Sequence, residues 1–471
     1  RPSYGNLWQY LDVQRAVRQI ERDFEGHHVE RLLQYIRQPS VSALNWGNQE
    51  MADLLDGEIR DYGGEAEVVQ TAEFPVVFGL IDEGAPRTLL FHGLYDVTPA
   101  EEPNWIVPPF EPAVVELEGL GPCVVGRGAE DMKTGIAIAM NAIGAIRKAG
   151  EKLPLNLMFV HEASELGSGG IKEFFPRYKQ KMKKANAAYW LCPMAQTDGT
   201  PIVPLGLKGN LMGRLFCRPG DWGGSLGNEI HALNSNWIGN PADRLVEAVA
   251  HLEKRLEEIY ERGEGWVPSD VQERLCRQLS ERMEPGRLMR SLGVQRFRQD
   301  DFHAAVRAHL FRPEFTLIGL QAGFIGEGKS VKVSIPSEAQ AVVNMRFLPG
   351  EDTDERIENV RCILREGGFG DIEFVVNNHY AGGATPPEHP LIACFLQAHK
   401  EMGADPEVWP VHPAGMPVAL WTEELGVPWV GGLPCNAMRK HAANEYAQVA
   451  GLLQSEKFLV HFFEGFSRLT Y

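Results

Sequence analysis

The chain has 471 residues, of which 44% are hydrophobic and 23% charged, a soluble globular profile too long for one ordinary hydrophobic core. Its formal net charge of −17 disfavours a nucleic-acid or anionic-membrane partner, because either would repel an acidic surface. No run of about 18 apolar residues is present, so no membrane-spanning helix is expected. The seven cysteines are scattered and odd in number, and we interpret them as reduced thiols of a cytoplasmic protein.

The first part of the chain alternates helical and extended patterns. Apolar residues recur at helical spacing before Pro39, and three β-rich runs follow. Helices that alternate with buried strands are typical of an α/β layer with a largely parallel sheet, in which chemistry gathers at the carboxyl ends of the strands. The predicted elements are a helix at 7–37, strands at 67–70, 76–81 and 88–92, a helix at 134–149 and a strand at 155–160.

The pattern changes near Gly206 and returns to α/β character from about Pro387. Between them we expect a strand at 211–218, a helix at 241–262 and a charged helical stretch at 264–312. Two further strands, at 331–335 and 339–347, are predicted to be joined by the Pro336–Ser337 turn, with a helix at 354–366. We therefore predict a catalytic domain made of residues 1–208 and 385–471, with an inserted α+β lid domain at 209–384.

Four polar clusters follow predicted buried strands. The first, His92-Gly-Leu-Tyr-Asp96, places an imidazole near a carboxylate that would orient it for a metal, although ordinary loop hydrogen bonding explains the same pair. The second runs from Gly126 to Gly135. A phosphate-binding loop is rejected there, because Met132 stands where that motif needs glycine before Lys133. The alternative is that this loop presents a carboxylate, Asp131, to the mouth of the sheet.

The third cluster runs from His161 to Ser168, directly after a very apolar strand, and the fourth runs from His441 to Tyr446. A helix N-cap followed by first-turn acids would explain the third, and a plain helix start would explain the fourth. The order of all four clusters, however, resembles that of the M20 metallopeptidases. That family's patterns run roughly H-G-H-Y-D-V, G-R-G-x-x-D-D-K-G, E-E-x-G-S and H-A-P-N-E. The similarity covers nearly the whole chain, and the long insertion resembles the carnosinase-like branch.

The resemblance implies a zinc-peptidase-like catalytic domain that holds one or two Zn²⁺ ions. His92 and His441 would each bind one zinc, Asp131 would bridge the ions and Glu165 would bind one of them, with Asp96 behind His92. From the lid, His231 would correspond to the histidine that stabilises the oxyanion. Arg346 would bind the substrate carboxylate, where the alternative is a surface charge on a strand.

Three departures from the family pattern fall on the general base, a metal ligand and the substrate contact. Ser164 stands where the family has its general base, and a hydroxyl cannot take a proton from a bound water as a glutamate does; Glu162 or His161 would have to replace it. Cys192 falls on a usual aspartate ligand, where it is either a zinc thiolate or a small buried thiol. The loop that binds the substrate carboxylate contains Gly415 and Met416, and Met416 offers no hydroxyl donor.

Three functions remain open at this point. The first is a zinc-dependent amidohydrolase or peptidase that acts on an amide bond of a small carboxylate-bearing substrate. The second is a non-hydrolytic relative that catalyses amide formation, acyl transfer or a cyclisation, because Ser164 replaces the base. The third is a non-catalytic binding protein. The carnosinase-like resemblance also implies a homodimer formed through the lid domain.

Overall fold

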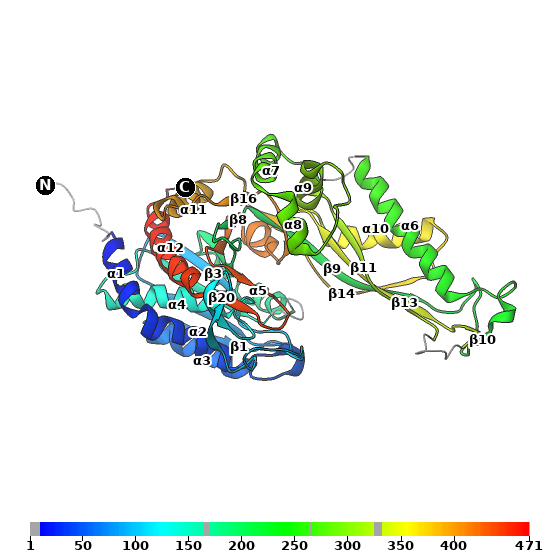
Figure 1. Ribbon diagram of the computed structural model, residues 1–471, viewed down its shortest axis with the longest axis horizontal. Coiled ribbons are helices and arrows are strands. Elements are labelled where there is room, and N and C mark those ends of the chain that lie inside the picture. Colours follow the sequence, from blue (N-terminus) through cyan, green and yellow to red (C-terminus); the bar gives the residue numbers. More distant parts are fainter. Residues whose placement is uncertain (1–9, 164–168, 263–265, 325–331, 471) are drawn as a thin grey trace. The chain divides into compact units, whose positions relative to one another are not determined.

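The computed structural model describes residues 10–163, 169–262, 266–324 and 332–470 (Figure 1). The chain folds into two compact units. The first comprises residues 1–206, 384–410 and 420–471, and the second comprises 207–383 and 411–419. The stretch 411–419, which the sequence analysis assigns to the catalytic domain, therefore packs with the inserted unit. Within the described residues, no helix is long and apolar enough to cross a membrane.

A six-stranded sheet forms the centre of the first unit. Its order is β1-β2-β6-β3-β7-β18, in which β6, β3, β7 and β18 run parallel and β1 and β2 form an antiparallel edge. The apolar runs are buried on both faces, as expected for a parallel sheet covered by helices on either side. The strands are β1 Glu65–Val69, β2 Val76–Ile81, β3 Thr88–Leu94, β6 Asn156–Glu162, β7 Ala187–Pro193 and β18 Trp429–Leu433.

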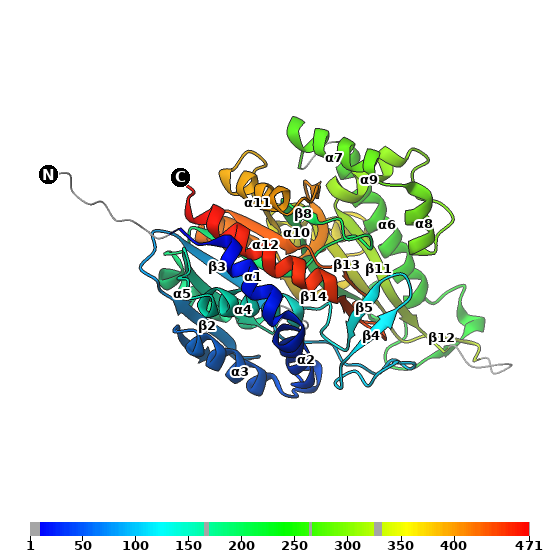
Figure 2. The same ribbon diagram turned by 60° about the vertical axis from the view of Figure 1, so that its left-hand side comes forward.

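Helices cover both faces of this sheet. One face packs against α4 (Lys133–Lys148), which is buried almost all round, as its continuous apolar sequence predicts, and against α12 (Val449–Ser467). Figure 2 shows α1 (Val13–Asp23) beside α12. The other face packs against α5 (Gly169–Met182), where Phe174 contacts Phe78 of β2. The remaining helices are α2 Val29–Arg37, α3 Asn48–Asp61 and α11 Pro390–Glu401, with single turns η1 Phe24–His28, η2 Ser42–Leu44 and η4 Leu420–Leu425.

A small antiparallel sheet, β19-β20-β5-β4, brings two distant parts of the first unit together. Its strand β5 leads into the loop before α4, while β20 follows the fourth polar cluster of the sequence, and Tyr446 of β20 pairs with Val125 of β5. The strands are β4 Ala113–Leu117, β5 Gly121–Val125, β19 Ala437–Met438 and β20 Tyr446–Gln448, and a separate parallel pair is formed by β8 Ile202–Pro204 and β16 Glu407–Trp409.

The second unit is built on an antiparallel sheet of order β11-β13-β9-β14, with α6 and α10 packed on one face. In β13 every second residue is buried, so the side chain of Arg346 lies on the face away from that core. The elements are β9 Gly206–Cys217, β10 Ile230–His231, η3 Ala232–Asn234, α6 Pro241–Glu261, α7 Asp270–Arg282, α8 Pro285–Leu292, α9 Phe302–Phe311, β11 Glu314–Ala322, β12 Ser334–Ile335, β13 Ala339–Phe347, α10 Thr353–Glu366, β14 Glu373–Tyr380, β15 Gly383–Ala384 and β17 His412–Gly415.

The two strands predicted on either side of Pro336–Ser337 are present as β12 and β13, but they do not pair with each other. Strand β12 pairs with β10, whereas β13 pairs with β11 and β9. The sequence analysis did not anticipate β11, which lies between the predicted helical stretch at 264–312 and the predicted strand at 331–335. Strand β13 pairs along nearly its whole length with both β11 and β9, whereas β12 has only two residues with which it could pair.

Two helical glycines offer a matched test of packing between α4 and the sheet. A Cβ added at Gly135, in the first turn of α4, would lie 1.9 Å from the carbonyl oxygen of Leu191. Gly57 in α3 has nothing within 4 Å. We expect Gly135→Ala to lower the free energy of unfolding by about 2–3 kcal/mol and Gly57→Ala to raise it by up to about 1 kcal/mol, measured by urea unfolding. Equal effects of the two substitutions would contradict this account.

A buried histidine makes the first unit sensitive to acid. His399 of α11 is buried between the rings of Phe395 and Phe458, and neither ring nitrogen has a hydrogen-bond partner among the described residues. Burial lowers its pKa from 6.5 to about 3. Below pH 6.5 the unfolded chain therefore binds a proton that the folded chain does not, so stability present above pH 6.5 is lost progressively towards pH 3.

We expect His399→Leu to remove this contribution. Between pH 7 and pH 5, the wild type should lose about 2 kcal/mol more unfolding free energy than the variant. Urea unfolding of both proteins at the two pH values measures the difference. Parallel losses in the two proteins would show that His399 is not protonated on unfolding.

Candidate functional site

Asp131 is the centre of the candidate site. It lies at the end of the loop between β5 and α4, and its side chain is 2% exposed. Its Oδ2 lies 3.0 Å from Nε2 of His441, and its Oδ1 lies 2.7 Å from Nζ of Lys440. The structure thus brings together two predicted ligands, Asp131 and His441, and adds a lysine that the sequence analysis did not single out.

The carboxylate of Glu445 holds this loop in place. Its Oε1 accepts hydrogen bonds from the backbone N–H groups of Gly128, Glu130 and Asp131, at 3.1, 2.7 and 2.9 Å. Its Oε2 accepts from Nη1 of Arg127 at 2.7 Å. Glu445 is fully buried; burial raises its pKa, while the hydrogen bonds with Asp131 and Arg127 act in the opposite direction. Three amides on one oxygen fix the path of the loop, and with it the direction of the Asp131 side chain.

Arg127, which binds the second carboxylate oxygen of Glu445, is also buried. We call the contacts of Glu445 with Arg127 and with the three loop amides the clamp. Nη2 of Arg127 donates to Oε1 of Glu102 at 2.6 Å and to the carbonyl oxygen of Pro99 at 3.2 Å, and its guanidinium stacks over Trp105. The clamp forms because β20 pairs with β5, which sets the residue before β20 beside the residue after β5. The same pairing gives a 3.0 Å hydrogen bond from Gly126 N–H to the carbonyl oxygen of Glu445.

The start of α4 is anchored separately. Lys133 is fully buried, and its Nζ donates to the carbonyl oxygens of Tyr35 and Gln38, at 2.8 and 2.6 Å, at the end of α2. Burial lowers the pKa of this lysine to about 7. The ammonium of Lys133 thus caps carbonyl groups at the C-terminus of α2, where a positive charge is stabilising.

His92 is paired with Glu162 on the opposite face of the sheet from α4. Its Nε2 lies 2.7 Å from Oε1 of Glu162, and its ring meets Trp421 edge-on. Both residues are buried, and Oε2 of Glu162 has no hydrogen-bond partner among the described residues. The pair forms because parallel β3 and β6 run in register, with Leu94 beside Glu162. The candidate base His161 points to the α4 face, where burial lowers its pKa to about 3.

Asp96 and Cys192 each have partners of their own. Oδ2 of Asp96 accepts a 2.5 Å hydrogen bond from Oγ of Ser42. The thiol of Cys192 donates to the carbonyl oxygen of Pro193 at 3.5 Å, and burial raises its pKa. The charge of Lys440 acts to lower the pKa of this thiol, and the charge of Asp131 acts to raise it.

The predicted lid residues belong to the second unit. His231 is exposed at the end of β10, and its Nδ1 accepts from the N–H of Leu233 at 3.1 Å. Arg346 donates from Nη1 to the carbonyl oxygen of Pro413 at 3.0 Å, and a Cβ added at Gly415 would lie 2.8 Å from that same nitrogen. Arg346 and Gly415 are therefore neighbours in space. Met416, which follows Gly415 in the sequence, is buried.

Two predicted residues, Ser164 and Glu165, lie outside the described residues. Within the described parts of the chain, no group of three or more His, Cys, Asp or Glu side chains gathers as a metal site. Asp131 and His441 are donors of the kinds that zinc accepts, and the structure brings them together. The further donors for a second ion, His92 and Cys192, are engaged by Glu162 and Pro193. Their ligand roles stay predictions.

Lys440, Glu445 and Arg127 are the site residues that the sequence analysis did not assign. Arg127 lies in the second polar cluster and Glu445 in the fourth, so their positions in these motifs were the signal from which a buried role could have been expected. Lys440 has no signal of its own, because a lysine before a histidine is unremarkable on an exposed loop.

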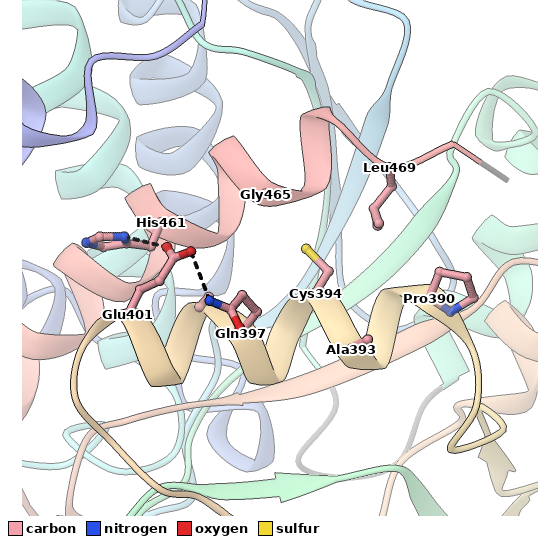
Figure 3. Close-up of a pocket in the computed structure, with 9 residues that line it drawn as sticks. Pro390, Ala393, Cys394, Gln397, Glu401, His461, Gly465 and Leu469 are labelled. Carbon is pink, nitrogen blue, oxygen red and sulfur yellow. Dashed lines mark hydrogen bonds and ion pairs between the residues drawn. The ribbon is translucent and has the colours of Figure 1, made fainter.

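A hollow of about 400 Å³ lies between α11 and α12, away from these residues. Figure 3 shows Cys394 between the two helices and the carboxylate of Glu401 between His461 and Gln397. None of the predicted catalytic, substrate-binding or metal-binding side chains lines it.

The clamp gives a direct test of how Asp131 is positioned. Glu445→Gln would turn one acceptor oxygen into a donor that faces either Arg127 or the three loop amides. We expect the free energy of unfolding to fall by about 3 kcal/mol or more, and hydrogen exchange at the amides of Glu130 and Asp131 to accelerate. The matched control is Glu118→Gln, an exposed glutamate, which should change neither. Unchanged exchange in Glu445→Gln would rule out the clamp.

Comparison with known proteins places the chain among peptidases. Residues 90–465 match the family described as "Peptidase family M20/M25/M40". The Cys-Gly metallodipeptidase DUG1 of Candida albicans is 26% identical over 378 residues, which cover 74% of each chain. The human Beta-Ala-His dipeptidase is 24% identical over 274 residues, which cover 56% of this chain and 50% of that protein.

Solved structures share the fold. An M20 family metallo-carboxypeptidase from Sulfolobus solfataricus superposes with a TM-score of 0.84 at 23% identity, covering 94% of this chain and 99% of that one. The dipeptidase Dug1p of Saccharomyces cerevisiae gives 0.79 at 17% identity, covering 98% of this chain and all of that one. The predicted α/β fold class is thereby confirmed. The chain belongs to peptidase family M20/M25/M40, a family of metal-dependent hydrolases.

Proposed function

We propose that this protein is a zinc-dependent peptidase that cleaves the amide bond of a small, carboxylate-bearing peptide. The observation that carries the proposal is the pair formed by Asp131 and His441, with the loop of Asp131 fixed by the buried carboxylate of Glu445. A divalent cation bound there would polarise the scissile carbonyl and lower the pKa of a bound water. Glu445 restrains the loop that carries the carboxylate of Asp131, so that this carboxylate and the imidazole of His441 stay close together.

The substrate class is supported by Arg346 and by the relatives. Arg346 is half-buried; its Nη1 donates to the carbonyl oxygen of Pro413 at 3.0 Å, and its Nε lies 3.9 Å from Oε2 of Glu314. Its guanidinium suits a planar carboxylate, such as the free C-terminus of a dipeptide. The curated relatives include a Cys-Gly metallodipeptidase and a Beta-Ala-His dipeptidase, and both names describe dipeptides with a terminal carboxylate.

A second candidate is favoured by the position of Glu162. Its Oε1 is engaged by His92 and the residue is fully buried, so it serves as the partner of His92 rather than as a base that reaches a bound water. With Ser164 in place of the family's base, this arrangement supports the non-hydrolytic alternative, in which an amine attacks the polarised carbonyl. The homodimer through the lid stays a prediction.

The metal and the activity are tested together by Asp131→Ala. We expect zinc content, measured by elemental mass spectrometry, to fall close to zero, and hydrolysis of Cys-Gly, β-Ala-His and N-acyl amino acids to fall about 100-fold or more. Glu118→Ala, an exposed control, should retain both. A variant at Asp131 that keeps its zinc and its turnover would sink the proposal. Wild-type protein that synthesises amides but does not hydrolyse them would select the second candidate.

A further inference from the structure

The short helix α8 (Pro285–Leu292) lies on the surface of the second unit. None of its eight residues is buried, and Figure 2 shows it at the outer edge of that unit. A helix of this length is marginal in water when it has no packing partner, because few hydrogen bonds offset the cost of starting it. Its stability must therefore come largely from the groups that cap its ends.

Both ends of α8 are capped. At the start, the side chain of Glu284 accepts hydrogen bonds from the backbone N–H groups of Gly286 and Arg287, at 3.0 and 2.6 Å. At the end, Gly293 has a φ of 67°, and the N–H of Val294 donates to a carbonyl oxygen of the last turn at 3.0 Å. The helix thus keeps one conformation while its side chains stay accessible, so a partner that binds it has little backbone left to order.

The accessible side chains of α8 and of the loop after it are arginines and apolar residues. We define the α8 patch as Arg287, Arg290, Leu292, Val294, Arg296 and Arg298, all of which are exposed. Arg290 lies 3.3 Å from Glu284, but both side chains of this pair are mostly exposed, so it contributes little. Arg296 and Arg298 form no ion pair with any residue that the structure describes.

The α8 patch carries the opposite charge from the chain as a whole. From 274 to 298 the sequence contains seven arginines, two glutamates, no lysine and no aspartate, whereas the whole chain has a net charge of −17. A positive surface on an acidic protein attracts anions to one place. Arginine is better suited than lysine to bidentate contacts with carboxylates. The patch therefore fits a partner that carries carboxylates.

We propose that the α8 patch is a docking site for an acidic segment of another protein, in which carboxylates are interspersed with apolar side chains. The arginines would bind the carboxylates, and Leu292 and Val294 would contact the apolar side chains. Arginine is enriched at protein interfaces, and apolar groups have no counterpart along a phosphate backbone. The inference does not depend on the proposed peptidase activity.

Other occupants fit the α8 patch less well. A nucleic acid or an anionic membrane would be repelled by the acidic remainder of the chain. A second copy of this chain, related by a two-fold axis through the patch, would set arginines against arginines. A short acidic segment avoids both problems, because it covers the patch alone.

The test is the binding of a labelled acidic peptide to the full chain. A fluorescein-labelled peptide rich in glutamate and leucine is titrated with the protein, and its fluorescence anisotropy is followed in low and in high salt. We expect binding that weakens as salt is added, since the contact depends on exposed charges. The same peptide with glutamine in place of glutamate should bind about tenfold more weakly or worse. With the acidic peptide bound, the amides of residues 285–294 should exchange more slowly.

Charge reversal locates the site. The double substitution Arg287→Glu and Arg290→Glu should weaken peptide binding about tenfold or more, because like charges across an interface repel. Leu292→Ser should weaken it about threefold or more, because it removes apolar contact area. The matched control is Arg18→Glu in α1, an exposed arginine of the first unit, which should change binding by less than about twofold. Circular dichroism checks that each variant is folded.

Several results would overturn the proposal. The acidic peptide failing to bind would do so, as would equal binding of the glutamine peptide or an equal loss in Arg18→Glu. Tighter binding of a single-stranded oligonucleotide, or of phosphatidylserine vesicles, would assign the α8 patch to another class of partner. Sedimentation velocity that shows salt-sensitive self-association, lost in the double variant, would assign it to a second copy of the chain.

Discussion

The buried carboxylate of Glu445 is the contact on which the rest of the site depends. It draws three backbone amides and the guanidinium of Arg127 onto two oxygens, which satisfies a loop that would otherwise leave polar backbone groups buried without partners. Since Asp131 is one of the residues whose amide is bound, the direction of its side chain follows from this contact. A predicted metal ligand is held in this way by hydrogen bonds to its backbone rather than to its side chain.

The parallel sheet explains where the polar side chains gather. His92 stands near the end of β3 and Glu162 at the end of β6, and parallel register sets them beside each other although 70 residues separate them. Asp131 follows β5 in the small neighbouring sheet and is joined to His441 through the pairing of β5 with β20. Two pairs result, each made of a histidine and a carboxylate, and each formed by strand register rather than by proximity in the sequence.

Much of this could be predicted from the sequence, and the reasons for the rest are physical. The α/β class follows from alternating apolar runs, and the order of the four motifs indicated Asp131 and His441, which the structure brings into contact. The partner of His92 could not be read, because strand register is set by contacts between distant segments. The pairing partners of the strands on either side of Pro336–Ser337 could not be predicted, because a turn signal is local, whereas β12 pairs with β10 and β13 pairs with β11 and β9. Lys440 was missed because its role depends on the left-handed backbone on either side of it.

The bond between Arg127 and Glu445 spans 318 residues of the chain, and the whole inserted unit lies between its two ends. During synthesis the loop of Asp131 therefore emerges long before the carboxylate that fixes it. At translation rates of about 5–20 residues per second, the interval is on the order of 15–60 seconds. The nascent first unit must remain incomplete for that time, with β5 lacking its partner β20 and Arg127 lacking its main anion. Chaperone demand should consequently be highest in this interval, and it should fall if the chain is circularly permuted so that β20 is made before β5.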